Sequence, residues 1–412
     1  MVIRLRWSFA EFLIYLIMLM SKITEREVSM GELSMPWPVS SRHDLDGLYN
    51  VLKQSKTGKN GPTAKQFEER FAEYNSVKHC ILCANGTVSL ELILRGLKIG
   101  RGDEVIIPAY TFIATASSVI YAGATPVFAD IDYGTSNLSA GSVREKITKR
   151  TKAIIPVYIG GRPADLDALA ALAEETGLYL IGDAAQAAGS EWKGKGVGTY
   201  GIAASFSCQN TKNLNSGEGG IITTNDHALA ENIRMILNGG LNQNGEYQFI
   251  GINHNITEWQ SSILNTQMDS LDRQIARRME SAAYLDSLLT DIPCVSPPDP
   301  DCRITKNTYH IYAFRFHGEK LKNVTRNCFI KAIEDELSAP GVISIGYMPL
   351  YTFPCLSNDY LNPKTDIVEL LSRHEALWIG HRVLLNDKPA IKKIADAIAK
   401  VYYKFSKLPK GV

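Results

Sequence analysis

The chain has 412 residues, of which 45% are hydrophobic and 21% are charged, a composition typical of a globular protein with room for two domains. Its formal net charge of +1 excludes a strongly basic surface of the kind that binds nucleic acid or acidic membranes. The cysteines, 7 in all, are scattered and odd in number, which favours reduced thiols in the cytoplasm over a disulfide framework.

Residues 1–35 are predicted to be an extension, either disordered or the result of a misassigned start. Residues 9–20 are nearly all apolar and follow two arginines, so they imitate a signal peptide or a membrane anchor. The stretch is too short to span a bilayer, contains Glu11, and precedes no small-residue cleavage site. We therefore expect an amphipathic arm, or a functional chain that begins near Met20 or Met30, and no membrane partner.

Strand-like and helix-like patterns alternate between residues 36 and 294. Short apolar runs predict strands, and amphipathic stretches between them predict helices. This alternation predicts an α/β fold, in which helices cover both faces of a mainly parallel sheet. The expected strands are 80–83, 104–108, 125–130, 153–158, 178–183 and 221–224, and the expected helices are 64–74, 88–97, 115–122, 165–176 and 257–289.

The proline-rich stretch 295–301 is the best candidate for a domain boundary. Beyond it the sequence predicts a strand over 309–316 and helices over 326–337 and 389–405. We therefore expect a large domain over 36–294, with an N-terminal arm, and a smaller α+β domain over 295–412.

Lys212 lies between a hydroxyl-bearing stretch and a Gly-x-Gly-Gly turn over 217–220, and Asp183 ends an apolar run upstream. Pyridoxal 5'-phosphate (PLP) needs these two groups, since a lysine amine binds its aldehyde and a carboxylate keeps its ring nitrogen protonated. Ligands of parallel sheets gather at the carboxyl ends of the strands, so we expect Lys212 and Asp183 to share one site.

Other residues near expected strand ends suit the rest of such a cofactor. Residues 85–87, Asn-Gly-Thr, form a strand-to-helix turn whose free N–H groups suit a phosphate, although an ordinary helix cap has the same sequence. Ser207 could donate to the phosphate, and Gln186 could reach the ring hydroxyl. Tyr110 and Phe112 could each stack on the ring or belong to the core.

These stretches, in this order, resemble the DegT/StrS family of PLP-dependent aminotransferases, which act on keto-sugars and related cyclic ketones. The resemblance covers about residues 36–404. It implies fold type I, with a mainly parallel seven-stranded sheet flanked by helices in the large domain and a smaller C-terminal α+β domain. The matching stretches are 85–87, 102–112, 183–187, 207–220 and 251–258.

The resemblance also implies roles for individual residues. Lys212 and Asp183 are the implied catalytic residues: Lys212 forms the internal aldimine and moves the proton, and Asp183 pairs with the pyridine nitrogen. Tyr110 is implied to stack on the ring, and Gln186 to contact the ring oxygen. No metal is implied. The implied phosphate ligands of the same chain are Gly86, Thr87 and Ser207.

The resemblance implies that the site is shared between two subunits. Asn253 is implied to reach the cofactor phosphate of the neighbouring subunit, with Asn255 as the alternative for that role. A homodimer with active sites at its interface is therefore expected.

Residues 36–38 and 374–385 are similar to a narrower branch, which contains the glutamine:scyllo-inosose aminotransferases and the aminohydroxybenzoate synthases. The implied activity is transfer of an amino group from L-glutamine or L-glutamate to a keto-sugar or keto-cyclitol. Gly182, Ala188 and Tyr158 depart from residues common in the family, and we expect each to be able to reshape the pocket.

Three alternatives stay open. A PLP-dependent sugar dehydratase shares the fold, but the lysine is replaced by histidine in that branch, so Lys212 argues against it. An aminohydroxybenzoate-type synthase is the second alternative. A non-catalytic regulatory homologue is the third, and the presence of both Lys212 and Asp183 argues against it.

Overall fold

The computed structural model describes residues 33, 35–54, 57–58, 61–321, 324–356 and 364–407. The apolar stretch over 9–20, and nearly all of the expected extension, lie outside these residues. In the part of the chain that is described, no helix has the length and apolar character needed to cross a membrane.

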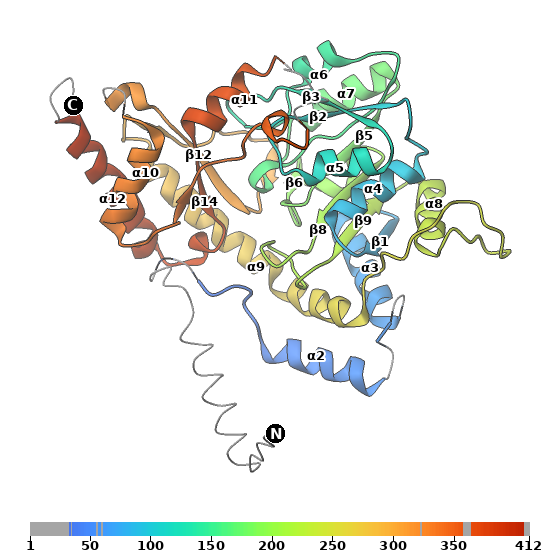
Figure 1. The fold of residues 1–412 in the computed structure, drawn as a ribbon. Coiled ribbons are helices and arrows are strands. Elements are labelled where there is room, and N and C mark those ends of the chain that lie inside the picture. Colours follow the sequence, from blue (N-terminus) through green and yellow to red (C-terminus); the bar gives the residue numbers. More distant parts are fainter. Residues whose placement is uncertain are drawn as a thin grey trace, which may run out of the picture.

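A seven-stranded sheet lies at the centre of the molecule (Figure 1). Its strands are β1 (His79–Cys83), β2 (Glu104–Pro108), β3 (Thr125–Ala129), β4 (Thr151–Ile154), β5 (Tyr179–Asp183), β8 (Ala203–Ser207) and β9 (Gly220–Thr224). Their order is β1-β9-β8-β5-β4-β2-β3, and only β9 runs against its neighbours. The expected mainly parallel sheet of seven strands is confirmed.

Helices cover both faces of this sheet, because the strands are apolar on both sides. In β2, Val105 and Ile107 face one core and Ile106 faces the other. The first core includes α4 (Gly86–Gly96), α5 (Ala114–Tyr121) and α8 (His227–Leu237). The second includes α3 (Pro62–Asn75), α6 (Ala140–Lys146), α7 (Leu166–Thr176) and the long α9 (Glu258–Leu289), beside which α2 (Arg42–Lys53) lies.

The C-terminal part is built on a second, antiparallel sheet. Its strands, in the order β10-β12-β14-β13, are β10 (Val295–Ser296), β12 (Ile311–Phe316), β13 (Ile343–Ser344) and β14 (Ala376–Gly380). A third core holds this sheet against α10 (Arg326–Leu337), α12 (Lys388–Ser406) and the end of α9. The short α11 (Asp366–Leu370) continues into a π-helical turn over 371–375, and 3₁₀ turns lie at 159–161, 197–199, 318–321, 350–352 and 383–385.

Most expected elements lie within a few residues of the observed ones. The helix over 326–337 and the strand over 104–108 have the predicted bounds. We propose the domain boundary near residue 294, since β10 begins the second sheet at Val295. The two parts share their cores across this boundary, because Leu350, Leu371 and Trp378 pack into the first core of the large sheet.

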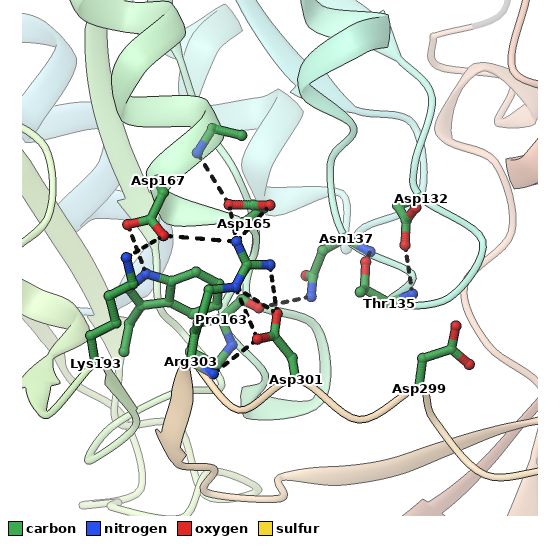
Figure 2. A network of polar contacts seen from close by, with 12 residues as sticks. Asp132, Thr135, Asn137, Pro163, Asp165, Asp167, Lys193, Asp299, Asp301 and Arg303 are labelled. Atoms are coloured by element: carbon green, nitrogen blue, oxygen red, sulfur yellow. Dashed lines mark hydrogen bonds and ion pairs between the residues drawn. The ribbon is translucent and has the colours of Figure 1, made fainter.

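A small sheet attaches the segment after the boundary to the large domain. It consists of β6 (Glu191–Trp192), β7 (Lys195–Gly196) and β11 (Ile304–Lys306). Arg303, just before β11, forms ion pairs with Asp165, Asp167 and Asp301 (Figure 2). Its nitrogens lie 3.0 Å, 3.7 Å and 2.7 Å from the carboxylate oxygens of these three residues, in that order. Exposed ion pairs contribute little singly, but those with Asp165 and Asp167 join the segment before β11 to the large domain.

Two departures from the family pattern contact each other in the core. A Cβ at Gly182 would lie 2.6 Å from the hydroxyl oxygen of Tyr158, so the tyrosine occupies the space that a side chain at 182 would need. Tyr158 and Ala188 are buried in the second core. None of the three lines the cavity described below, so their effect on its shape, which stays a prediction, would act through neighbouring residues.

Candidate active site

A cavity of about 570 Å³ opens at the carboxyl edge of the large sheet. Strands β1, β5 and β8 run in the same direction, so the residues that follow them meet at this edge. The structure thus brings together six of the predicted site residues, which all line the cavity: Gly86, Thr87, Asp183, Gln186, Ser207 and Lys212.

Asp183 ends β5 and is 5% exposed. Its Oδ2 accepts a hydrogen bond from Thr115 Oγ1 at 2.8 Å, and its Oδ1 accepts one from the Ala185 N–H at 3.3 Å. Burial raises the pKa of Asp183, and these hydrogen bonds and the charge of Lys212 oppose the rise. A buried carboxylate with only neutral hydrogen-bond donors fits a ligand that brings a positively charged N–H.

Lys212 projects from the turn between β8 and β9. The turn is held by the Cys208 N–H on the Gly219 carbonyl at 2.7 Å and by the Lys212 N–H on the Gln209 carbonyl at 2.8 Å. Burial lowers the pKa of Lys212, and the negative charge of Asp183 opposes this. A larger fraction of the amine is therefore unprotonated and nucleophilic than in a solvated lysine.

The first turn of α4 forms a concave backbone surface that suits a phosphate. Asn85 begins the helix by accepting the Val88 N–H at 3.0 Å, which leaves the preceding N–H groups at the cavity. A Cβ at Gly86 would lie 2.9 Å from Cβ of Ser207, so only glycine allows this approach of α4 to β8. The Ser207 hydroxyl lies beside these donors.

Gln186 is held from two sides. Its Oε1 accepts the Gly160 N–H at 2.7 Å, and its Nε2 donates to the hydroxyl of Tyr347 at 2.9 Å. Burial raises the pKa of Tyr347 to about 12, so this hydroxyl stays protonated at neutral pH. The second hydrogen of the Gln186 amide remains to contact a ligand in the cavity.

The structure corrects the prediction for Tyr110. Its side chain is 0% exposed and packs edge-on against Tyr347 and Trp378, with ring centroids 6.0 Å away from both. The absence of a side chain at Gly346 makes room for it, since a Cβ there would lie 1.6 Å from its hydroxyl oxygen. Phe112, which is 59% exposed, lines the cavity in its place.

Asn253 and Asn255 do not line the cavity of their own chain. The side-chain amide of Asn255 donates to the Leu237 carbonyl at 3.3 Å and to Oδ1 of Asn253 at 3.0 Å. Asn253 is exposed. A contact of either residue with a phosphate therefore requires the cavity of another subunit, which stays a proposal.

Three residues that complete the site were not predicted. Thr115 donates to Asp183, and His310 and Tyr347 line the cavity from the C-terminal part. Thr115 lies one helical turn after Thr111, whose hydroxyl it contacts at 3.0 Å, and threonines near a helix start suggest only capping. His310 precedes an ordinary strand, so the sequence has no local signal for its role.

Comparisons with known proteins match residues 41–399 to the DegT/DnrJ/EryC1/StrS aminotransferase family. The chain is 34% identical over 401 residues to L-glutamine:2-deoxy-scyllo-inosose aminotransferase of Streptomyces kanamyceticus, covering 89% of this chain and 92% of that protein. It is 39% identical over 329 residues to GDP-perosamine synthase of Caulobacter vibrioides, covering 79% and 87%. The crystal structure of 3-amino-5-hydroxybenzoic acid synthase superposes with a TM-score of 0.81 at 31% identity, covering 90% of this chain and 99% of that one.

The fold and the cavity together define an aminotransferase of fold type I, a class of PLP-dependent enzymes. The chain belongs to the DegT/DnrJ/EryC1/StrS aminotransferase family. The predicted family, fold class and enzyme class are confirmed, and the family implies PLP as the cofactor. The buried Asp183, the amine of Lys212 and the free N–H groups of α4 fit that cofactor.

Because Phe112 lines the cavity and Tyr110 is buried in the core, we expect their substitutions to affect the affinity for PLP differently. Phe112→Ala should weaken the affinity for PLP by about 2- to 10-fold, the loss of one aromatic contact. Tyr110→Phe should leave the affinity unchanged, because its hydroxyl is buried in the core and does not line the cavity. Titration of each apoprotein with PLP, followed by absorbance, checks both. A larger loss in Tyr110→Phe than in Phe112→Ala would contradict the placement.

Proposed function

We propose that the protein transfers the amino group of L-glutamine or L-glutamate to the ketone of a keto-cyclitol or keto-sugar. One observation supports this proposal most strongly. The Lys212 amine, the Asp183 carboxylate and the N–H groups in the first turn of α4 all lie at one cavity. The inosose aminotransferase and the perosamine synthase, both relatives of this chain, support a sugar-like acceptor. A cavity of about 570 Å³ is in the size range of sites for cofactors and small substrates.

The side chains of the cavity have distinct tasks in this proposal. PLP, when bound, supplies a ring that stabilises negative charge on the substrate carbon. Asp183 stabilises the proton on the ring nitrogen, and Gln186 holds the ring oxygen. Lys212, whose pKa is lowered by burial, takes a proton at Nζ from the donor's α-carbon and later delivers one to the acceptor's carbon. The N–H groups of Gly86 and Thr87 and the Ser207 hydroxyl bind the phosphate.

A second candidate is an aminohydroxybenzoate-type synthase. The similarity to the solved structure of such a synthase, at 31% identity over 90% of this chain, supports this second candidate. The lysine and the carboxylate would have the same tasks in both reactions. The two candidates differ in the product, which is an amine on a saturated ring in the first and an aromatic amine in the second.

A screen of acceptors tests the proposal. The holoenzyme is incubated with L-glutamine or L-glutamate labelled with ¹⁵N at the α-amino group, and with keto-cyclitols, nucleotide-linked keto-sugars and cyclic precursors of aminobenzoates. We expect mass spectrometry to find ¹⁵N in a saturated aminocyclitol or aminosugar. Lys212→Ala should reduce the rate by at least about 10²- to 10⁴-fold, because it removes the proton carrier. Label in an aromatic product alone, or an unaffected Lys212→Ala variant, would contradict the proposal.

We also propose that the working unit is a homodimer in which Asn253 of each chain binds the phosphate in the other chain's cavity. The exposure of Asn253 and its position outside its own cavity support this. Asn253→Ala should bind PLP more weakly without unfolding, since a charge-assisted phosphate contact contributes about 1–3 kcal/mol.

Subunit mixing tests the shared site. Lys212→Ala chains are mixed with Asn253→Ala chains and allowed to exchange, and each mixed dimer should recover one intact cavity. Activity of the mixture should therefore rise above that of either variant. The same mixing with Asn255→Ala distinguishes the two asparagines. If mixed dimers form, as native mass spectrometry can show, and activity stays at the level of the variants, the shared site is wrong.

A further inference from the structure

The peptide bond between Thr211 and Lys212 is held on both of its polar atoms. The Lys212 N–H donates to the Gln209 carbonyl at 2.8 Å, and the Thr211 carbonyl accepts from Nε2 of His381 at 2.9 Å. His381 follows β14 in the C-terminal part of the chain. An imidazole from the second sheet therefore fixes the peptide plane to which the lysine is attached.

Two neighbours determine which nitrogen of His381 carries the proton. A carbonyl can only accept, so the contact with Thr211 requires a proton on Nε2. A guanidinium can only donate, and Nη2 of Arg278 lies 3.3 Å from Nδ1, so Nδ1 is unprotonated. Burial and the charges of Arg278, Arg382 and Lys212 lower the pKa of His381 to about 3, although the Thr211 carbonyl opposes this. His381 is thus a neutral ring with one tautomer.

Arg278 is a buried cation with an unusual set of partners. It is 0% exposed in the middle of α9, and it forms no ion pair with a carboxylate of the described residues. Its Nη2 also donates to Gln274 Oε1 at 3.2 Å, and its guanidinium lies 5.4 Å from the ring centre of Trp37. Burial lowers its pKa to about 9. Keeping this charge out of water has a desolvation cost, which the contacts with Gln274, His381 and Trp37 offset in part.

The same cluster also joins the two stretches that resemble the narrower branch of the family, 36–38 and 374–385. Trp37 meets the ring of His381 edge-on, with centroids 4.6 Å apart. On the other side, the ring of His310 stacks on His381 at 5.3 Å. Nδ1 of His310 lies 3.2 Å from Oδ1 of Asn213, the residue after Lys212. Both neighbours of the lysine are therefore held by histidines of the C-terminal part.

We propose that His381 is a positioning residue, which Trp37 packs against and Arg278 keeps in one tautomer, so that the lysine side chain is directed into the cavity. The proposal rests on the proposed role of Lys212 as the reactive amine. It assigns a task to residues 36–38 and 374–385, which is to hold the backbone beside Lys212 in place. It also links the placement of the C-terminal part to the chemistry of the large domain.

The reactivity of Lys212 in the apoprotein tests this proposal without use of the enzymatic reaction. Each variant is exposed briefly to acetic anhydride over a range of pH, and mass spectrometry of the Lys212 peptide gives the pH of half-maximal acetylation. His381→Phe keeps a ring between Trp37 and His310 but removes both nitrogens. We expect it to raise that pH by about one unit, a tenfold loss of free amine near neutral pH, because the released ammonium reaches water.

Two control variants separate positioning from general damage. His381→Gln retains an N–H donor and should stay close to the parent. His317→Phe replaces a histidine of the C-terminal part that contacts Ser296, away from the lysine, and should also match the parent. A His381→Phe protein with the half-maximal pH of the parent would overturn the proposal. If Lys212 of the parent titrates as an ordinary solvated lysine, that result contradicts the proposed role of Lys212 as the reactive amine, independently of the result for His381→Phe.

The tautomer can be measured in the parent protein, so the proposal remains testable if His381→Phe does not fold. In ¹⁵N-histidine-labelled protein, two-bond ¹H–¹⁵N spectra identify the protonated nitrogen, and the missing signal in His381→Gln assigns it. We expect a neutral ring with its proton on Nε2 from about pH 5 to about pH 8. A proton on Nδ1, or a doubly protonated ring within that range, would overturn the proposal.

Discussion

The burial of the Asp183 carboxylate beside the Lys212 amine is the constraint on which the site depends. Burial raises the pKa of the acid and lowers that of the amine, so it pushes both groups toward their neutral forms. Their mutual attraction opposes both shifts. A ligand that brings a protonated ring nitrogen to the carboxylate and an aldehyde to the amine satisfies both groups at once. The two groups are therefore preorganised for such a ligand.

The fold meets this constraint with elements from distant parts of the chain. The shared direction of β1, β5 and β8 brings the phosphate-binding turn, the carboxylate and the lysine turn to one edge. The C-terminal part contributes His310 and Tyr347 to the cavity lining. Its β11 pairs with β6 of the large domain, and Arg303 beside it contacts three carboxylates.

Much of this arrangement could be predicted from the sequence, since it depends on local signals. Apolar runs predicted the strands, and the turn chemistry around Gly86 and Lys212 predicted which strand ends form the site. The error at Tyr110 had a different origin. Both Tyr110 and Phe112 follow β2. Tyr110 is the buried ring because Gly346, more than 200 residues later, has no side chain to occupy the space of its hydroxyl.

The contacts made by Thr115, Tyr347 and His381 escaped prediction for the same reason. A threonine in a first helical turn, a tyrosine in a loop and a histidine after a strand have no distinctive local pattern. Their tasks arise from hydrogen bonds to Asp183, Gln186 and the carbonyl of Thr211, which only the tertiary structure creates. The compensation between Gly182 and Tyr158 is likewise a matter of packing across the sheet.

Covalent trapping of the cofactor tests the central claim most directly. The protein is saturated with PLP, treated with sodium borohydride to reduce any bond between an amine and the aldehyde, and digested for peptide mass spectrometry. The account predicts one phosphopyridoxyl group per chain, on Lys212, and a large reduction of this trapping in Asp183→Ala. Stable incorporation at another lysine, or a protein that binds PLP without any reducible bond, would contradict it.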